Sequence, residues 1–275
     1  MYTFQNGDRW EKCKADIREL MLQPLFFKNL QGSIHAHLWG QQCERFLKEP
    51  GGGEFALNQI EQIVDAQFVP LIRYGPGDPA AHHVASLILS QFATTTWPIV
   101  GNALLREDAF MLSDLLGVRS TYSFAKPGDL EREEFACVLW SVPANVLIPW
   151  CHLHPGVVGH ILEFIGLFIT QDDGSFRWQP SALALIEDFY RDDFSNMILS
   201  SLFSFGSTGS RVPYVERRIN LVKQLSSNSN PSVRSMSDEL VKHLESQVQM
   251  EQKHDEEFNA GIPWRSPGHR HPWHR

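Results

Sequence analysis

The chain has 275 residues, of which 43% are hydrophobic, so it can bury the core of one long helical domain or of two small ones. Its formal net charge of −8 argues against a nucleic-acid partner, because nucleic-acid-binding domains are usually basic. The four cysteines form no C-x-x-C pair, which argues against a zinc knuckle and is typical of reduced thiols in a cytoplasmic protein.

Residues 1–129 are predicted to form an irregular helical region. Helices are expected over residues 10–30, 34–48, 55–72, 80–93 and 99–116 from the spacing of their apolar side chains. Pro24 is expected to bend or end the first helix. The glycine run in residues 49–53 predicts a flexible break, and the Thr-Trp-Pro segment 94–98 separates the last two helices. A short extended stretch is expected at residues 120–124.

Residues 130–258 are predicted to form antiparallel helix pairs, most clearly at their end. Two helices carry an apolar stripe at helical spacing, and their stripe residues are Val215, Ile219, Val222 and Leu225, then Val233, Met236, Leu240, Leu244 and Val248. Asn230 is expected to cap the second helix, and Pro231 suits its first position because the missing N–H would be unpaired there. The charged residues 251–257 are expected to fray into solvent.

A spacing of 38 residues separates similar positions in the chain. Pro155, Asp193 and Pro231 follow one another at this interval, and Pro79 precedes Pro155 by twice as much. A period of about 40 residues is the length of a two-helix HEAT or armadillo repeat. Gly117 occupies the intermediate position and matches poorly, and ordinary helical hairpins are the alternative explanation.

The C-terminal half resembles HEAT-repeat proteins. Pro231, Val233 and Arg234 match the P-x-V-R start of that family's second helix, with Asn230 in place of the common Asp. The resemblance implies a short α-solenoid, a binding or scaffold function, and a bond from Arg234 to a neighbouring turn. Residues 178–189 and 206–218 also resemble the helical C-terminal parts of large bacterial NTPase-type signalling or defence proteins, although the chain has no G-x-x-x-x-G-K-[ST] motif.

Several histidines are candidate metal ligands or general bases. His82 and His83 are adjacent, and His152 and His154 flank a leucine beside Cys151, but no second set of ligands completes either group in the sequence. Residues 172–174, Asp-Asp-Gly, lack the EF-hand spacing and are interpreted as a turn that ends a helix. The sequence therefore predicts no catalytic residue, no metal site and no cofactor. The longest apolar run, residues 161–169, is too short to span a bilayer, so no membrane partner is expected.

The prediction is an all-α, non-catalytic protein-interaction or scaffold module, part of a bacterial signalling or defence assembly. The candidate partner-binding residues are Arg217, Arg218, Lys223 and Arg234, which are expected to form a basic stripe, and Trp264 in the disordered Pro/His/Arg tail 259–275. Two alternatives stay open. One is an all-α enzyme that uses the histidines above in a metal or hydrolase site, and the other is a nucleic-acid-binding helical repeat.

Overall fold

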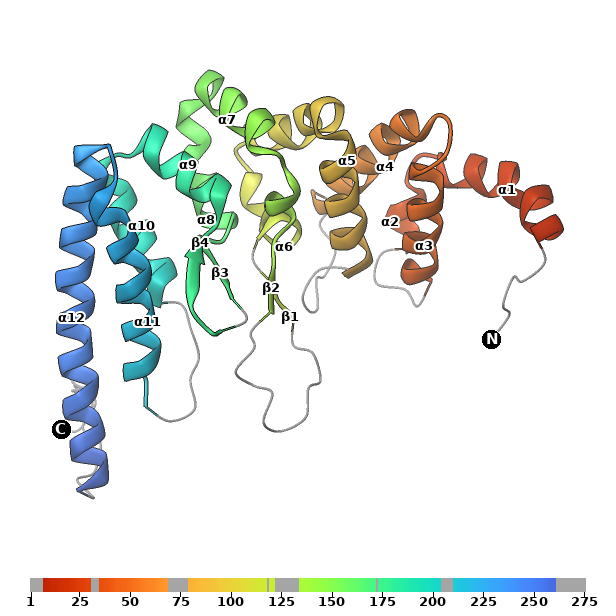
Figure 1. The fold of residues 1–275 in the computed structure, drawn as a ribbon. Coiled ribbons are helices and arrows are strands. Elements are labelled where there is room, and N and C mark those ends of the chain that lie inside the picture. The colour runs from red at the N-terminus through yellow and green to blue at the C-terminus, as the bar shows by residue number, and fades with distance from the viewer. Residues whose placement is uncertain are drawn as a thin grey trace, which may run out of the picture. The chain divides into compact units, whose positions relative to one another are not determined.

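A computed structural model describes residues 7–30, 35–68, 79–117, 119–121, 134–171, 173–203 and 210–260 (Figure 1). These residues are mostly helical, as the sequence predicts. By its internal contacts the chain divides into two compact units. Unit 1 consists of Met1–Thr170 and Trp178–Phe189, and unit 2 consists of Gln171–Arg177 and Tyr190–Arg275. The sequence placed a boundary after residue 129, whereas the contacts place the division in the segment 170–190.

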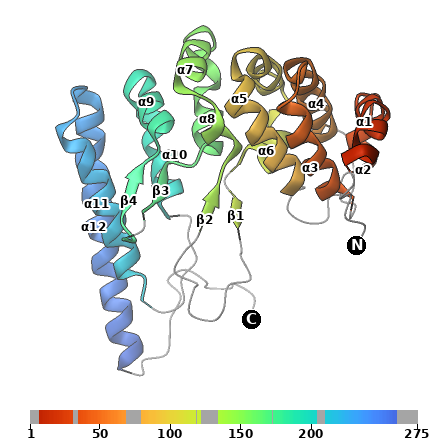
Figure 2. The same cartoon turned by 45° about the vertical axis from the view of Figure 1, so that its right-hand side comes forward.

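Unit 1 begins with five helices. They are α1 (Gly7–Met21), α2 (Phe26–Leu30), α3 (Ala36–Leu47), α4 (Gly52–Gln67) and α5 (Pro79–Leu104). Helices α3, α4 and α5 contact one another, and both views show them as neighbours (Figures 1 and 2). Their shared core contains large side chains that are fully buried, among them Phe46, Phe55, Ile60, Ile88 and Trp97. Each such side chain contributes roughly 1.5–3 kcal/mol through burial, so this contact holds the first half of the unit together.

The rest of unit 1 consists of short elements. In chain order they are η1 (Ala109–Leu112), α6 (Ser113–Leu116), β1 (Arg119–Thr121), β2 (Glu134–Ala136), η2 (Val138–Ser141), α7 (Ala144–Leu153), η3 (Pro155–Val157), α8 (Val158–Phe164), β3 (Phe168–Thr170) and α9 (Pro180–Phe189). Strands β1 and β2 pair antiparallel, with Ser120 opposite Phe135. Helix α9 packs on α7 and α8. Of the extended stretch expected at residues 120–124, residues 120 and 121 are confirmed in β1, and residues 122–124 lie outside the described residues.

Unit 2 contains α10 (Asp192–Phe203), α11 (Val212–Lys223), η4 (Gln224–Ser227) and α12 (Pro231–Asn259). Helices α11 and α12 lie side by side in both views and share the largest interface of this unit (Figures 1 and 2). Both predicted stripes face inward, since Val215, Val222, Val233 and Leu244 are buried. The side-chain oxygen of Asn230 accepts the Ser232 amide at 3.0 Å, which confirms the predicted cap before Pro231.

Helix α12 does not fray where its sequence becomes charged. It stays helical to Asn259, and the predicted fraying of residues 251–257 is wrong. Glu251 accepts hydrogen bonds from Arg211 at 3.4 Å and from Gln247 at 2.9 Å, and Ser210 donates to Asp255 at 2.5 Å. These side chains tie the charged turns to the segment that begins α11, so contacts that are distant in sequence support the end of the helix.

The predicted separation of two helices at residues 94–98 is misplaced, because two helical segments meet at a kink two residues earlier, at Phe92. Helix α5 runs through Pro98, and its irregular residue is Phe92, with φ −127° and ψ 22°. The hydroxyls of Thr95 and Thr96 donate to the Phe92 carbonyl at 3.0 and 2.9 Å. Because these hydroxyls partner the carbonyl at the kink, the threonines bend the helix without ending it. The break expected at residues 49–53 lies between the end of α3 at Leu47 and the start of α4 at Gly52, so Gly52 and Gly53 already belong to the helix.

A hairpin takes the place of the helix-ending turn expected at residues 172–174. Strands β3 and β4 (Phe176–Trp178) form a two-stranded sheet, and the division between the units passes through this hairpin. Gly174 has φ +78°, which a glycine adopts at little cost. The backbone N–H of Gln171 donates to the Ser175 carbonyl at 2.8 Å, and the backbone N–H of Ser175 donates to the Asp173 carboxylate at 2.9 Å. The aromatic and β-branched residues beside the turn favour strands, a signal that the sequence analysis missed.

Candidate functional site

Three amide side chains of α4 hold the turn between α1 and α2. Gln59, which is 0% exposed, donates from Nε2 to the Met21 carbonyl at 2.9 Å and accepts the Trp39 indole N–H at 2.9 Å. Gln62 donates to the same Met21 carbonyl at 3.0 Å and accepts the Phe27 amide at 3.0 Å. The last carbonyls of a helix and the first amides of the next have no partner within their own helix. The α4 amides supply those partners, so they fix the α1–α2 turn against α4.

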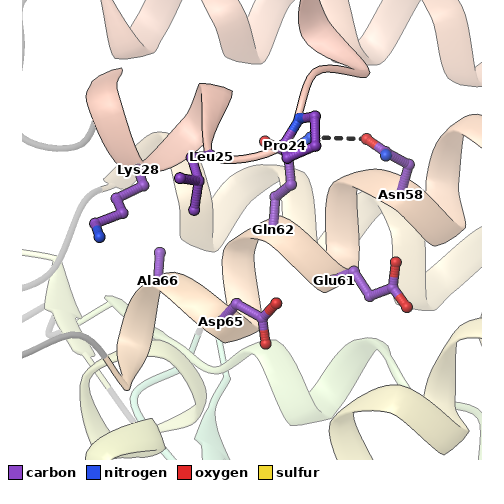
Figure 3. A pocket seen from close by; sticks show the side chains of 8 residues that line it. All are labelled: Pro24, Leu25, Lys28, Asn58, Glu61, Gln62, Asp65 and Ala66. Atoms are coloured by element: carbon purple, nitrogen blue, oxygen red, sulfur yellow. Dashed lines mark hydrogen bonds between the residues drawn. The ribbon is translucent and has the colours of Figure 1, made fainter.

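A hollow of about 220 Å³ opens beside these amides, between the α1–α2 turn and α4 (Figure 3). It is lined by Pro24, Leu25, Lys28, Asn58, Glu61, Gln62, Asp65 and Ala66. Gln62 donates to the Asn58 side-chain oxygen at 2.8 Å, and Asn58 donates to the Leu22 carbonyl at 3.3 Å. The polar part of the lining is therefore held by hydrogen bonds, while Pro24, Leu25 and Ala66 give the hollow an apolar wall.

The charges around this hollow are Lys28 on α2 and Glu61 and Asp65 on α4. The two carboxylates are four residues apart and so lie on one face of α4. Within the described ranges, none of the three charged groups forms an ion pair shorter than 4 Å. Arg106, which interacts electrostatically with Asp65, pairs with Asp108 at 2.9 Å and lies 3.6 Å from the Phe68 ring centroid. The hollow therefore has two carboxylates and one ammonium that are open to a ligand.

The structure does not bring His152 and His154 together. His152 lies 3.6 Å from the Asp188 carboxylate and contacts the Phe189 ring at a tilt, whereas His154 contacts the Trp150 ring at a tilt, each with ring centroids 4.6 Å apart. A histidine beside a carboxylate is part of the arrangement that activates a nucleophile, but the neighbouring Cys151 is buried. His83 is exposed and His82 is half-buried. Among the described residues, no group of three or more His, Cys, Asp or Glu side chains is placed to hold a metal ion.

Three cysteines are buried as neutral thiols. Burial raises the pKa of Cys137 and of Cys151 to about 12, and it raises the pKa of Cys43 well above the ordinary value of 9.0. The Cys137 thiol also donates to the Leu116 carbonyl at 3.1 Å. Because the thiolate is the reactive form, these side chains are structural at neutral pH. Only Cys13 is exposed among the four.

We expect iodoacetamide at pH 8 to modify Cys13 alone in the folded chain and all four cysteines in guanidinium. Intact-mass measurement counts the adducts, and Cys13→Ser is expected to leave the folded chain unmodified. The raised pKa values also make the free energy of unfolding depend on pH. The contribution of the buried thiols is fully present below about pH 9 and is lost as the pH rises towards about 12, because the thiols of the unfolded chain lose their protons first. Rapid alkylation of Cys151 would contradict the buried position.

The basic stripe predicted from the sequence is not an exposed stripe. Arg218 is only 3% exposed; its Nη1 donates to the Tyr214 carbonyl at 2.9 Å, and its guanidinium lies 5.2 Å from the Phe176 ring centroid. Arg218 comes three residues after Val215 and four before Val222, so helical spacing puts it on the buried face. Arg218 therefore belongs to the buried face of α11 and not to an exposed basic stripe.

The other candidate partner-binding residues differ in their surroundings. Arg217 is half-buried, donates to the Gly174 carbonyl at 3.3 Å and lies over the Tyr214 ring at 4.8 Å. Lys223 is exposed and pairs with Glu245 at 3.5 Å. Arg234 donates to the Asn228 and Ser229 carbonyls at 2.7 and 3.0 Å, which agrees with the turn contact that the resemblance implied. Trp264 lies outside the described residues. The arginines thus stabilise turns of unit 2.

Arg218→Met is expected to lower the stability of unit 2 by about 1–3 kcal/mol. It removes the bond to the Tyr214 carbonyl and the contact with Phe176, while it keeps a long apolar side chain. The matched control is Lys223→Met, which removes a solvent-exposed ion pair and is expected to cost less than about 1 kcal/mol. Urea denaturation followed by circular dichroism measures both, and equal losses would argue against the buried role of Arg218.

Sequence reasoning missed the hollow, although α4 carries one signal of it. Asn58, Gln59 and Gln62 interrupt a helix face that also contains Ile60 and Ile63, and amides on a buried face need hydrogen-bond partners.

Comparison of the chain with protein-family models, with curated proteins and with solved structures finds no match. The described helices include none that combines the length and the apolar character needed to cross a membrane.

Proposed function

We propose that this chain is a protein-interaction or scaffold module built from HEAT-like, antiparallel helix pairs. The observation that carries the proposal is the packing of helices on neighbours in chain order. In unit 1, α3, α4 and α5 contact one another and α9 packs on α7 and α8; in unit 2, α11 packs on α12. Repeat proteins bury their apolar faces against sequence neighbours in this way and use the remaining surface for binding.

Details of the α11–α12 pair support the HEAT-like form of the proposal. Pro231 begins α12 after the Asn230 cap, Val233 is buried, and Arg234 bonds to the turn before it. Pro79 and Pro155 likewise begin α5 and η3. Prolines at the predicted interval therefore occur at helix starts, the position to which a repeated two-helix unit would bring them.

The chemistry of the described side chains favours binding over catalysis. Cys151, which is adjacent to His152 in the sequence, is buried, and burial raises its pKa to about 12, so its thiol is protonated at neutral pH. Large apolar side chains stay exposed on unit 1, including Leu25, Phe110 and Leu153. Exposed aromatic and leucine side chains are common contact points in protein interfaces.

The test is affinity capture of the tagged full chain from a lysate of its source organism, with mass spectrometry of the co-eluting proteins. We expect one protein in stoichiometric amount at moderate salt and none with the tag alone. Isothermal titration with that protein, purified separately, then measures the dissociation constant. A chain that elutes alone at every salt concentration, and that binds no purified candidate, would overturn the proposal.

A further inference from the structure

We propose that the hollow between the α1–α2 turn and α4 binds a lysine or arginine side chain of a partner protein. This inference rests on the proposed function, and it names the chemistry of the partner. The sequence alone suggested the opposite, an acidic partner for a basic stripe. In the structure Arg218 is buried, Arg234 holds a turn and Lys223 is paired with Glu245, whereas the charges that line the hollow are mainly acidic.

The apolar wall of the hollow suits the stem of a long cationic side chain. Leu25 is 57% exposed although it lies next to buried residues, and its φ of 67° is a left-handed conformation that leucine rarely adopts. The hydrogen bonds of Gln62 and Asn58 hold the turn in this conformation. Lysine and arginine pack their methylene groups on apolar surface while the charged end stays near water. The wall formed by Pro24, Leu25 and Ala66 offers that surface.

The charged side chains around the hollow determine whether it attracts a cation or an anion. Glu61 and Asp65 lie along the α4 side, and Lys28 lies on the α2 side (Figure 3). The sum is −1, so the hollow attracts a cation, and Lys28 directs that cation towards the two carboxylates. Some surface charges elsewhere in the described part of the chain are paired, for example Lys14 with Glu49 at 2.7 Å and Lys48 with Glu44 at 2.8 Å. Neither Glu61 nor Asp65 forms an ion pair of this kind with a described residue, although Asp65 interacts electrostatically with Arg106, which is itself paired with Asp108.

The shape of the site favours a side chain over a metal ion. No third acidic or imidazole side chain of the described residues joins Glu61 and Asp65 in a metal-binding group. Calcium takes six to eight oxygen ligands, which two exposed carboxylates do not supply. An ammonium or guanidinium needs fewer partners and gains from the apolar wall, so the hollow fits a basic residue with neighbouring apolar residues.

The direct test uses n-butylammonium, which has the same carbon stem and charged end as a lysine side chain. Titration into the ¹⁵N-labelled full chain is expected to shift the backbone amides of Leu25, Lys28, Gln62 and Asp65, while n-butanol shifts them much less. The double substitution Glu61→Gln and Asp65→Asn is expected to weaken binding about fivefold, the scale of an exposed ion pair. Glu54→Gln removes one exposed charge at the start of α4 and is expected to leave binding unchanged.

Three results would overturn the proposal. They are equal shifts from n-butanol, equal weakening by Glu54→Gln, or shifts of the same size in the double variant once its circular dichroism shows a native fold. A synthetic peptide of the chain's own residues 261–275 is tested as a competitor. If it displaces n-butylammonium better than an acetylated Leu-Lys-Leu peptide does, the occupant is this chain's own end and the assignment to a partner falls.

The same variants separate this inference from the proposed function. If the wild type captures a protein and the double variant captures it about fivefold less well, both stand. If both chains capture the protein equally, the scaffold function stands and the hollow is not the contact. If n-butylammonium binds in the hollow but no protein is captured, the site takes cations and the scaffold function fails, together with the assignment to a partner protein.

Discussion

Gly101→Ala is expected to lower the free energy of unfolding by about 2 kcal/mol, although alanine is the better helix former. A Cβ at this position would lie 2.7 Å from Cε2 and 2.9 Å from Nε1 of Trp150, far inside van der Waals contact. Trp150 has little room to move, because its ring packs edge-on against Trp97 at 5.4 Å and stacks on His154 at 4.6 Å. Overpacking of this kind costs about 1–3 kcal/mol.

Gly40→Ala is the matched control for this substitution. Gly40 also lies inside a buried helix, but an added Cβ would meet Ala80 at 3.7 Å and Val84 at 3.8 Å, which are ordinary contacts. Replacement is expected to be neutral or to stabilise the chain by up to about 1 kcal/mol through helix propensity. Chemical denaturation measures both variants. Equal stability of the two would mean that the Trp150 ring does not lie against Gly101.

Gln59→Leu is expected to cost about 3 kcal/mol, the largest effect of any single substitution at the candidate site. Leucine keeps much of the volume but leaves the buried Trp39 indole N–H without an acceptor and removes a donor to the Met21 carbonyl. A buried polar group without a partner costs about 1–3 kcal/mol, and the Met21 carbonyl in addition loses one of its two donors, keeping the bond from Gln62. Gln41→Leu, on the exposed face of α3, is the control and is expected to change stability by less than about 0.5 kcal/mol.

A double-substitution cycle shows whether the Gln59 effect comes from this hydrogen bond. Trp39→Phe removes the indole N–H, so Gln59→Leu is expected to cost at least about 1 kcal/mol less in that background. Strictly additive losses would contradict a direct bond between the two side chains. Because Gln59 also holds the turn that carries Leu25, we expect its loss to weaken n-butylammonium binding as well.

Local patterns predicted the helices well where one face is apolar and the caps are standard. The α11–α12 pair follows from the stripes at Val215 and Val233 and from Asn230 before Pro231. The kink at Phe92 was not predictable in the same way, because it depends on hydroxyl bonds that keep Thr95 and Thr96 within the helix. The burial of Arg218 was accessible from spacing alone, but the ring that receives it, Phe176, comes from a hairpin far along the chain.

The hollow depends on contacts between segments that are distant in sequence. Gln62 reaches the Phe27 amide, and Asn58 reaches the Leu22 carbonyl, across more than thirty residues. The spacing of apolar residues in the sequence shows that such amides interrupt an apolar helix face, but it does not show which backbone groups they hydrogen-bond. The conformation of Leu25 is set by those partners, so neither the hollow nor its exposed leucine could be predicted from local sequence.

The passage of the chain through the β3–β4 hairpin affects how the protein forms during synthesis. Unit 1 includes Trp178–Phe189, so it is incomplete until the ribosome has released residue 189. By then the hairpin tip that belongs to unit 2 has already emerged. Its contacts with Arg217, which donates to the Gly174 carbonyl, and with Arg218, which lies over the Phe176 ring, form only after those arginines have been synthesised. Domains generally fold in order as they leave the ribosome. Here one nascent segment serves both units, so no single cut of the gene separates two complete folding units.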